Sequence, residues 1–298
     1  MSNQNIFITG ATGKIGQALI KGILQKDWQI KVLILKGEEI FHYPKVSIIS
    51  GDLLDPEGYA PELNGVDTVL HMAAITHTNK VSRYYEVNSD ATLKLIEACK
   101  AQGIKRFIYI STRAISEEGG DYSKSKAAAE KYVQQSGLDW VIIRPAEVYG
   151  LSGKEGVDMI LNNIQKFPFV PIIGDGKYEI APVYVADVIT SIINVIERRD
   201  IKDRVYNIAG PESFTYNQFI DRVLSLKHLR KMKIHIPGIV FRFLAQVAVF
   251  IFKDRFIAMD QLQRLFSEKS DDISLATREL SFNPSKLDDI IGEGGQNA

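Results

Sequence analysis

The chain has 298 residues, of which 45% are hydrophobic and 24% are charged, as in an ordinary soluble globular protein. Lys plus Arg and Asp plus Glu both total 36, so the charge balance gives no electrostatic reason to expect a nucleic-acid partner. A single cysteine, Cys99, excludes an intrachain disulfide and a cysteine-built metal site, and its apolar helical surroundings predict a buried, inert thiol.

The first residues, "MSNQN", lead directly into a short apolar run, with no basic region ahead of an apolar core. This start predicts no secretory signal and a cytoplasmic location. Through the first two-thirds of the chain, short apolar runs then alternate with longer amphipathic segments. The runs are rich in β-branched residues and lack strict alternation, which is typical of strands buried on both faces; they lie at 5–9, 30–35, 46–50, 67–72, 105–111 and 139–144.

Helical patterns at 14–27, 84–103 and 121–137 separate several of these runs, and the last two end in glycine, a usual C-cap signal. Strands that alternate with helices imply right-handed crossovers. We therefore predict an α/β fold with a Rossmann-type, doubly wound parallel sheet.

Beyond residue 150 the alternation weakens. We expect a helix-forming unit at 182–199 and a strand candidate at 204–210 to return to the sheet. The chain from about 211 onward is mostly helical in pattern. We predict an NAD(P)-binding Rossmann domain with a smaller, mostly helical C-terminal annex that binds substrate. The Rossmann domain comprises 1–150 with 182–210 returning to it, and the annex comprises 151–181 and 211–298.

One apolar stretch, 237–252, is shorter than the roughly 20 residues that span a bilayer, and Arg242 and Gln246 interrupt it. We predict no transmembrane segment. Because a basic stretch precedes it, this region could contact a membrane surface or close over a hydrophobic substrate. The alternative is a strand at 231–237 that leads into a helix packed in the annex core.

The segment "FITGATGKIG" joins the first strand to the first helix. Gly10, Gly13 and Gly16 at this junction allow a tight turn and a close backbone approach to a pyrophosphate at the helix N-terminus. We predict a dinucleotide here, held by the three glycines together with the residues between them, Thr12, Lys14 and Ile15.

The end of the second strand bears on the choice between NAD and NADP, because a carboxylate there accepts from a ribose hydroxyl and a cation tolerates a 2′-phosphate. Lys36 favours NADP over NAD. Glu38 and Glu39 follow closely and could reach back to the ribose instead.

Several motifs occur together and in order: "TGATGKIG" (9–16), "GDLLD" (51–55), "HMAA" (71–74), "VNSDATLKLIEA" (87–98), "YIST" (109–112), "YSKSK" (122–126) and "RPAEVYG" (144–150). With "PVYVADV" (182–188) and later segments they cover most of the chain. Their combination resembles the extended short-chain dehydrogenase/reductase superfamily of NAD(P)-dependent epimerases, dehydratases and reductases.

The resemblance assigns Asp52 and Leu53 to the adenine pocket, with a turn residue as the plainer alternative for Asp52. It also implies that Ala73 and Ala74 line the cofactor beside its ribose and pyrophosphate, because small side chains let the cofactor lie against the backbone. His71 is interpreted as a strand-end residue and not as a catalyst.

In the superfamily, the tyrosine of "YSKSK" is the acid/base, and the lysine stabilises the phenolate and binds the nicotinamide ribose. These roles fall to Tyr122 and Lys126, which share one helix face because they are four residues apart. Thr112 matches the family's threonine that donates to the substrate oxygen, and Ser111 is the alternative.

Three departures from the family pattern bear on the substrate. Only ten positions separate Thr112 from Tyr122, where the family usually has a longer loop. Arg113 and Ala114 replace the acidic pair of the sugar-nucleotide dehydratases, which argues against sugar dehydration. The arginine that clamps a diphosphate before the "VYV" strand is missing, since Ile180 and Ala181 lie there, with Lys177 further upstream.

The resemblance therefore implies an NAD(P)-dependent oxidoreductase or epimerase that transfers hydride at a secondary alcohol or ketone carbon of a small-molecule substrate, sugar-like or hydrophobic. The alternative is an NAD(P)-binding protein without turnover, acting as a redox sensor or an assembly subunit. We predict no metal. Members of the family often form homodimers through the helices that correspond to 84–103 and 121–137.

Overall fold

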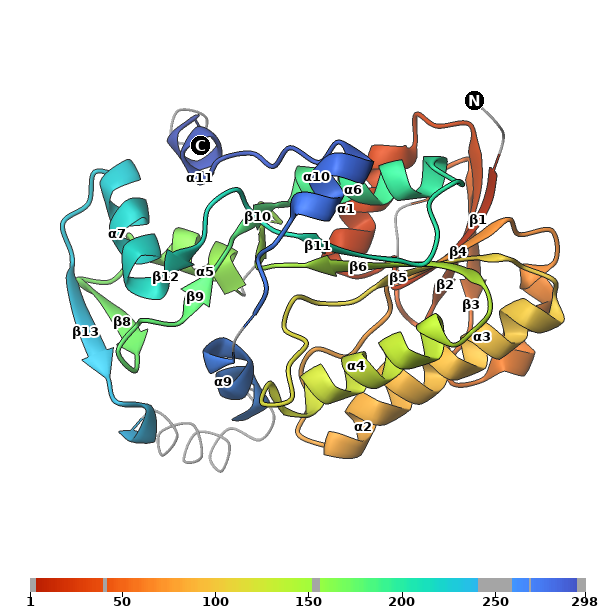
Figure 1. Cartoon of the computed structure of the whole chain (residues 1–298), viewed down its shortest axis with the longest axis horizontal. Helices are drawn as coiled ribbons and strands as arrows, with labels where there is room; N and C mark the ends of the chain where they lie inside the picture. The colour runs from red at the N-terminus through yellow and green to blue at the C-terminus, as the bar shows by residue number, and fades with distance from the viewer. Residues whose placement is uncertain (1–3, 40–41, 152–155, 241–258, 268, 294–298) are drawn as a thin grey trace. The chain divides into compact units, whose positions relative to one another are not determined.

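The structure is a computed structural model that describes residues 4–39, 42–151, 156–240, 259–267 and 269–293. Its central sheet has seven strands in the order β11-β6-β5-β4-β1-β2-β3 (Figure 1). Their bounds are β1 (Gln4–Thr9), β2 (Trp28–Ile34), β3 (Val46–Ser50), β4 (Thr68–His71), β5 (Arg106–Ile110), β6 (Asp139–Pro145) and β11 (Arg204–Ile208). The pairings from β3 across to β6 are parallel, and the strand order reverses between β1 and β4, so the predicted Rossmann-type fold is confirmed.

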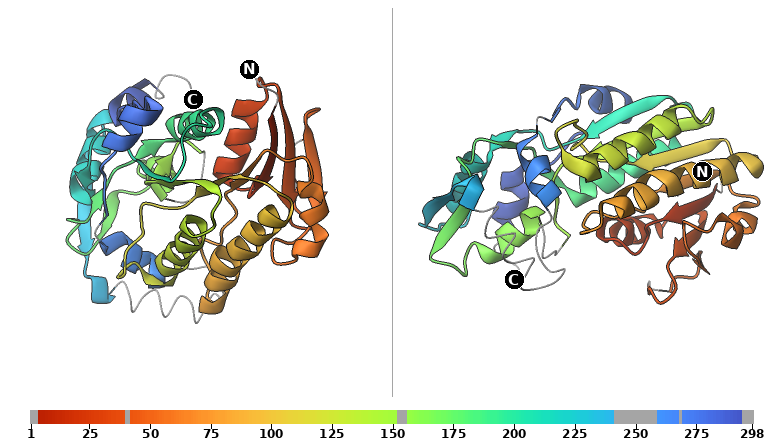
Figure 2. Two further views of the ribbon diagram at one scale, coloured as in Figure 1. Left: turned by 45° about the vertical axis from the view of Figure 1, so that its right-hand side comes forward. Right: turned by 90° about the horizontal axis from the view of Figure 1, so that it is seen from below.

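Helices cover both faces of this sheet (Figures 1 and 2). α1 (Lys14–Ile23) and α6 (Val185–Glu197) lie on one face, and α3 (Ala91–Ala101) and α4 (Gly120–Gln134) lie on the other. The helix predicted at 84–103 is divided into three parts: α2 (Val81–Tyr85), a π-helical turn (Glu86–Asp90) and α3. The glycines expected to end two helices, Gly103 and Gly137, have φ of 71° and 74°, as C-cap glycines do.

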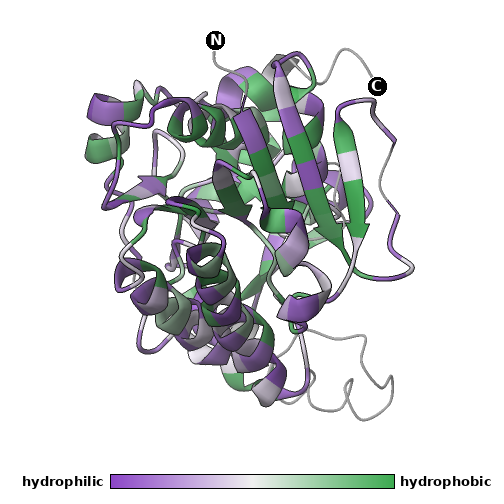
Figure 3. Cartoon of the chain, turned by 90° about the vertical axis from the view of Figure 1, so that its right-hand side faces the viewer, coloured by the Kyte–Doolittle hydropathy of each residue, from purple (hydrophilic) through white to green (hydrophobic). Residues whose placement is uncertain are grey.

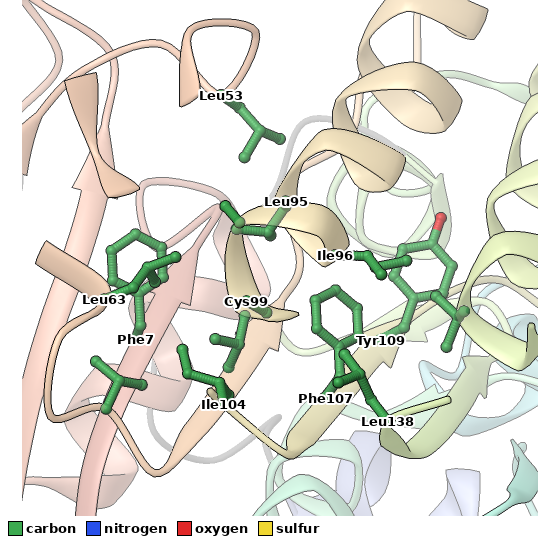
Figure 4. Packing of buried hydrophobic residues seen from close by; sticks show 14 of the residues in the cluster. Phe7, Leu53, Leu63, Leu95, Ile96, Cys99, Ile104, Phe107, Tyr109 and Leu138 are labelled. Carbon is green, nitrogen blue, oxygen red and sulfur yellow. The ribbon is translucent and has the colours of Figure 1, made fainter. Parts of the chain in front are cut away.

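Successive side chains of β1 point to opposite faces of the central sheet, so the strand contributes to the apolar core on both faces. Phe7 packs in the cluster that α3 and α4 cover, and Figure 4 shows Leu95, Ile96 and Cys99 of α3 within it. Figure 3 shows hydrophobic residues concentrated in the strands, with polar residues on the outer turns of the helices. The predicted burial of Cys99 is confirmed, and burial raises the pKa of its thiol to about 12, which keeps it protonated.

The chain divides into two compact units. The first contains Met1–Thr112, Asp121–Arg144 and Ile189–Tyr206, and the second contains Arg113–Gly120, Pro145–Val188 and Asn207–Ala298. The second unit has three two-stranded sheets, made by β7 (Val148–Tyr149) with β10 (Val183–Tyr184), β9 (Glu179–Ile180) with β12 (Phe214–Thr215), and β8 (Phe169–Ile173) with β13 (Met232–Ile236). Its other helices are α5 (Gly156–Asn163), α7 (Tyr216–Leu226), α9 (Met259–Phe266), α10 (Ser274–Leu280) and α11 (Leu287–Glu293).

The strand predicted at 231–237 is present as β13. Most of the apolar stretch at 237–252 lies outside the described residues, so its packing against a membrane, a substrate or the annex core stays a prediction. Within the described part of the chain, no helix combines the length and apolar character needed to cross a membrane.

Candidate active site

The glycine turn after β1 meets the chain just beyond β4. Gly10 has φ of 76°, and a Cβ there would lie 2.6 Å from the backbone nitrogen of Ala73, closer than side-chain atoms pack. Only glycine permits this approach. The fold thereby brings together two of the predicted cofactor contacts, Gly10 and Ala73, with the half-buried Ala74 next in the chain.

Gly13 and Gly16 shape the start of α1. Gly13 is the N-cap, with φ of −66° and ψ of 162°, and Lys14 and Ile15 are the first two residues of the helix. Among the described residues, no side chain accepts a hydrogen bond from the backbone N–H groups of this first turn. A Cβ at Gly16 would lie 2.3 Å from the carbonyl oxygen of Gly10, whereas a Cβ at Gly13 would meet only that oxygen, at 3.3 Å. A helix N-terminus without a side-chain cap offers backbone N–H groups to an anion such as a pyrophosphate.

Beyond β2, the carboxylate of Glu38 turns back toward the glycine loop. It accepts hydrogen bonds from the hydroxyl of Thr12 at 3.0 Å and from the backbone N–H of Leu35 at 3.2 Å. Lys36 is exposed. The structure therefore fixes Glu38, the sequence-based alternative to Lys36, against a predicted cofactor residue.

Asp52 and Leu53 follow β3 and have clear local roles. The carboxylate of Asp52 accepts from the backbone N–H of Leu54 at 2.9 Å, which stabilises a turn. Leu53 is 7% exposed and packs in the same core cluster as Tyr59. Their contact with an adenine ring stays a prediction.

α4 presents Tyr122 and Lys126 one turn apart. Tyr122 is 6% exposed, and its ring lies edge-on to Tyr84 with 6.0 Å between ring centres. Lys126 is 1% exposed; its Nζ donates to the carbonyl of Ile110 at 2.8 Å and lies 4.1 Å from the ring centre of Tyr109. Because Ile110 ends β5, Lys126 reaches the carboxyl edge of the sheet, where open α/β sheets bind their ligands.

Burial determines the electrostatics of this lysine. It lowers the pKa of Lys126 to about 7, an effect that the nearby Glu130 carboxylate opposes. Glu130 is 3% exposed and pairs with the guanidinium of Arg144 on β6, whose Nε lies 2.8 Å from the carboxylate. Lys126 therefore changes charge close to neutral pH.

This shift predicts a pH-dependent stability. Between pH of about 7 and 10.5 the unfolded chain binds a proton at Lys126 that the folded chain lacks, so stability should rise with pH in this window. Relative to a Lys126→Met variant, the wild-type free energy of unfolding should increase by up to about 1.4 kcal/mol per pH unit. Denaturant unfolding of both proteins across the window measures this difference, and a difference independent of pH would contradict the assigned shift.

His71 at the end of β4 belongs to a buried chain of hydrogen bonds. Its Nδ1 lies 2.6 Å from the hydroxyl of Thr9, and its Nε2 lies 2.8 Å from the hydroxyl of Thr92. The Thr92 hydroxyl donates to the carbonyl of Asn88, so it accepts from Nε2–H, and Thr9 donates to Nδ1. Burial, followed by the charge of Lys126, lowers the pKa of His71 to about 3, which supports its interpretation as a neutral strand-end residue.

Asn88 lies in the segment "VNSDATLKLIEA", and the sequence alone assigns it no role at the site. Its side chain is 1% exposed, exchanges hydrogen bonds with the backbone of Ile75 at 2.8 and 3.0 Å, and donates to the hydroxyl of Ser125 at 3.1 Å. Ser125 in turn donates to the carbonyl of Tyr122 at 2.8 Å. Asn88 thus ties the turn of α4 that carries Tyr122 to the chain after β4. A polar amide inside an apolar helical pattern is the signal that could have identified it.

Ser111 and Thr112 follow β5. Ser111 is 7% exposed, and its hydroxyl has no hydrogen-bond partner within the described ranges, whereas Thr112 is half-buried. Both therefore remain candidates for the substrate-oxygen donor, and the preference for Thr112 stays a prediction.

Arg113, which replaces the first acid of the dehydratase pair, belongs to an ion network of the second unit. Its guanidinium lies 2.7 Å from the carboxylate of Glu147 and also contacts Asp271, and Lys269 lies 3.3 Å from Glu147. Burial opposes ionisation of Glu147, but Lys269 and Arg113 outweigh it and lower the pKa of this carboxyl. The two cations and the two carboxylates of this network balance in charge.

The positions that match the family's diphosphate clamp carry two buried apolar side chains and, further upstream, an exposed lysine. Ile180 is 3% exposed and Ala181 is fully buried, while the exposed Lys177 lies 4.0 Å from the carboxylate of Asp175. Within the part of the chain that the structure describes, no group of three His, Cys, Asp or Glu side chains could hold a metal ion.

Known proteins resemble this chain in both sequence and structure. It is 25% identical to human sterol-4-alpha-carboxylate 3-dehydrogenase, decarboxylating, over 77% of this chain and 68% of that protein, and 26% identical to Caulobacter vibrioides ceramide reductase, over 66% and 65%. The structure of the dTDP-glucose 4,6-dehydratase DesIV from Streptomyces venezuelae, with NAD bound, matches with a TM-score of 0.78 and 20% identity over 97% of this chain and 95% of that one. The chain spans about three-fifths to three-quarters of the length of the curated relatives it matches.

A family model described as NAD(P)H-binding matches residues 10–194, more than half of the 298 residues. The match begins at Gly10 of the glycine turn and includes Tyr122 and Lys126. This match shows that the chain belongs to the NAD(P)H-binding family.

Proposed function

We propose that this protein is an NAD(P)-dependent oxidoreductase that transfers hydride at a secondary alcohol or ketone carbon of a hydrophobic, lipid-like substrate. The observation that carries the proposal is the buried Lys126 at the end of β5, one helical turn after Tyr122 on α4. A cation at that place stabilises a phenolate on the same helix face. Proton exchange with a substrate oxygen requires such an acid/base.

The residues around the glycine turn fit a dinucleotide, because the missing side chains of Gly10 and Gly13 leave the backbone and the start of α1 accessible. We assign the pyrophosphate to the loop from Gly10 to Gly16. The adenosine is assigned to Asp52, Leu53, Ala73 and Ala74. Bound NAD(P) would supply or accept the hydride at its nicotinamide ring.

Each catalytic residue then has a separate task. Tyr122 gives a proton to the substrate oxygen during reduction and takes it back during oxidation. Thr112, or Ser111 beside it, donates a hydrogen bond that orients this oxygen. Lys126 binds the ribose hydroxyls through its amino group, and its protonated form places a positive charge beside the phenol.

Two observations support a lipid-like substrate over a sugar nucleotide. The relatives named above act, by name, on a sterol carboxylate and on ceramide. In this chain, Arg113 is neutralised by carboxylates, and Ile180 and Ala181 replace the diphosphate clamp. A substrate without a diphosphate needs no such clamp.

The test is turnover by the purified full chain with NADH and NADPH. We expect oxidation of the cofactor with a 3-ketosteroid or a long-chain ketone, and the reverse reaction with the corresponding alcohols. UDP-glucuronic acid and dTDP-glucose serve as the sugar-nucleotide arm. Turnover of these nucleotides alone would contradict the lipid assignment, and tight cofactor binding without turnover across both arms would contradict the enzyme assignment.

For the cofactor, we propose NAD over NADP, because Glu38 contacts Thr12 of the glycine loop and would face a 2′-phosphate with a like charge. NADH should bind about tenfold more tightly than NADPH, and Glu38→Gln should remove this preference. Lys36→Ala is the matched control and should change the ratio little. A wild-type preference for NADPH that Lys36→Ala abolishes would instead support the sequence-based expectation.

A further inference from the structure

The β8–β13 sheet of the second unit has one buried and one outer face. Met232 pairs with Phe169 and Ile234 with Pro171, so these residues share one face of the two strands, which Figure 1 draws side by side. Val170 and Ile172, which point to the opposite face, lie in the core of the unit. The face that carries Phe169 and Met232 therefore points away from this core.

This outer face is apolar and exposed. Phe169 is 40% exposed, Met232 70% and Ile234 39%. Phe167, two residues before β8, is 55% exposed, and Ile239, three residues after β13, is 80% exposed. We call these five residues the β8–β13 patch. Of the ten large apolar side chains that are exposed in the described part of the chain, six lie in 167–169 and 232–240. A cluster of this kind marks an interaction surface.

The two segments that carry the patch contain charged side chains of one sign only. Segments 165–173 and 226–240 contain five Lys or Arg residues and no Asp or Glu, although the whole chain has no net charge. Lys231 donates to the backbone carbonyls of Gln165 and Phe167, which holds the two segments together, and Lys233 pairs with Asp221. Lys166 and Arg230 are exposed and form no ion pair with any described residue.

We propose that the β8–β13 patch docks on the surface of an anionic lipid bilayer. Exposed Phe, Met and Ile side chains can enter the boundary between head groups and acyl chains, while basic residues at the rim pair with anionic lipids. A second copy of the chain is disfavoured as the occupant, because a symmetric contact would bring the cations of both rims together. The inference goes beyond the proposed reaction and requires no catalytic turnover.

Co-sedimentation of the full chain with vesicles tests this surface without substrate or cofactor. Vesicles of phosphatidylcholine with phosphatidylglycerol should bind the protein, and vesicles of phosphatidylcholine alone should bind it much more weakly. The charge variant Lys166→Ser/Arg230→Ser should weaken binding by about fivefold for each cation removed. The apolar variant Phe167→Ser/Met232→Ser should weaken it by about tenfold or more. Added salt should weaken wild-type binding as well.

Matched control variants replace exposed basic and apolar side chains that lie outside the β8–β13 patch. Lys100→Ser/Lys105→Ser removes two exposed cations, and Val81→Ser removes an apolar side chain that is 51% exposed. Both should bind vesicles like the wild type. All the altered side chains are solvent-accessible, so melting temperature and circular dichroism should confirm that each variant folds.

Absence of wild-type binding to the anionic vesicles would overturn the proposal, and so would either of two further results. One is vesicle binding that the patch variants and the control variants reduce equally. The other is a wild-type dimer that Phe167→Ser/Met232→Ser converts to a monomer while vesicle binding is absent, because the patch would then be a contact between copies. Failure of the proposed reaction would leave vesicle binding unchanged, so the two proposals can fail separately.

Discussion

Replacing Tyr122 by Phe should reduce turnover by about 10²–10⁴-fold while leaving cofactor affinity nearly unchanged. The substitution removes only the hydroxyl that exchanges a proton with the substrate. The ring remains, so its edge-on packing against Tyr84 and the start of α4 should be preserved. Steady-state rates with the best substrate of the ketone panel, together with a cofactor titration by fluorescence, measure both quantities.

Two variants on the same helix sharpen this prediction. Tyr132→Phe is the control for the loss of a phenol, because Tyr132 packs partly buried against the core and should lose little activity. Lys126→Met should reduce both turnover and cofactor affinity, since it removes the cation and the donor to the ribose. A Tyr122→Phe protein with near-normal turnover would show that the motif serves only as scaffold in this chain.

A valine at Gly13 should weaken NAD(P) binding by at least about 100-fold, or about 2.7 kcal/mol, in a protein that remains folded. The backbone there is extended, a conformation that β-branched residues adopt readily, and a Cβ would meet only the Gly10 carbonyl oxygen at 3.3 Å. The added side chain would instead occupy the space through which a pyrophosphate approaches the start of α1. Calorimetric titration and a thermal melt separate the two effects.

Gly16→Val provides the contrast. A Cβ at Gly16 would lie 2.3 Å from the Gly10 oxygen and 2.7 Å from the Cα of Ala11, so the backbone of the turn must move. We expect a loss of about 3 kcal/mol or more in the free energy of unfolding, seen as a lower denaturant midpoint. If Gly13→Val instead unfolded the protein while Gly16→Val did not, the assignment of the two glycines would be reversed.

The order of strands and helices could be predicted from the sequence because it depends on local patterns. β-branched runs buried on both faces and amphipathic segments between them are properties of neighbouring residues, and right-handed crossovers then leave few possible topologies. The same locality explains why Gly10, Gly13 and Gly16 and the pair Tyr122 and Lys126 could be recognised. Their spacing in the chain is the spacing that a turn or a helix face requires.

What only the tertiary structure decided depends on residues far apart in sequence. Glu38, and not Lys36, contacts the glycine loop because the end of β2 lies beside the turn after β1 in the parallel sheet. Asn88 reaches both Ile75 and Ser125 because a π-helical turn brings it between the end of β4 and α4. The pKa of Lys126 falls because packing on Tyr109 and Ile110 excludes water. The apolar β8–β13 patch exists because β13 pairs with β8, which brings Met232 beside Phe169, 63 positions earlier in the chain. Burial and strand register are set by the whole fold, so no local pattern could specify them.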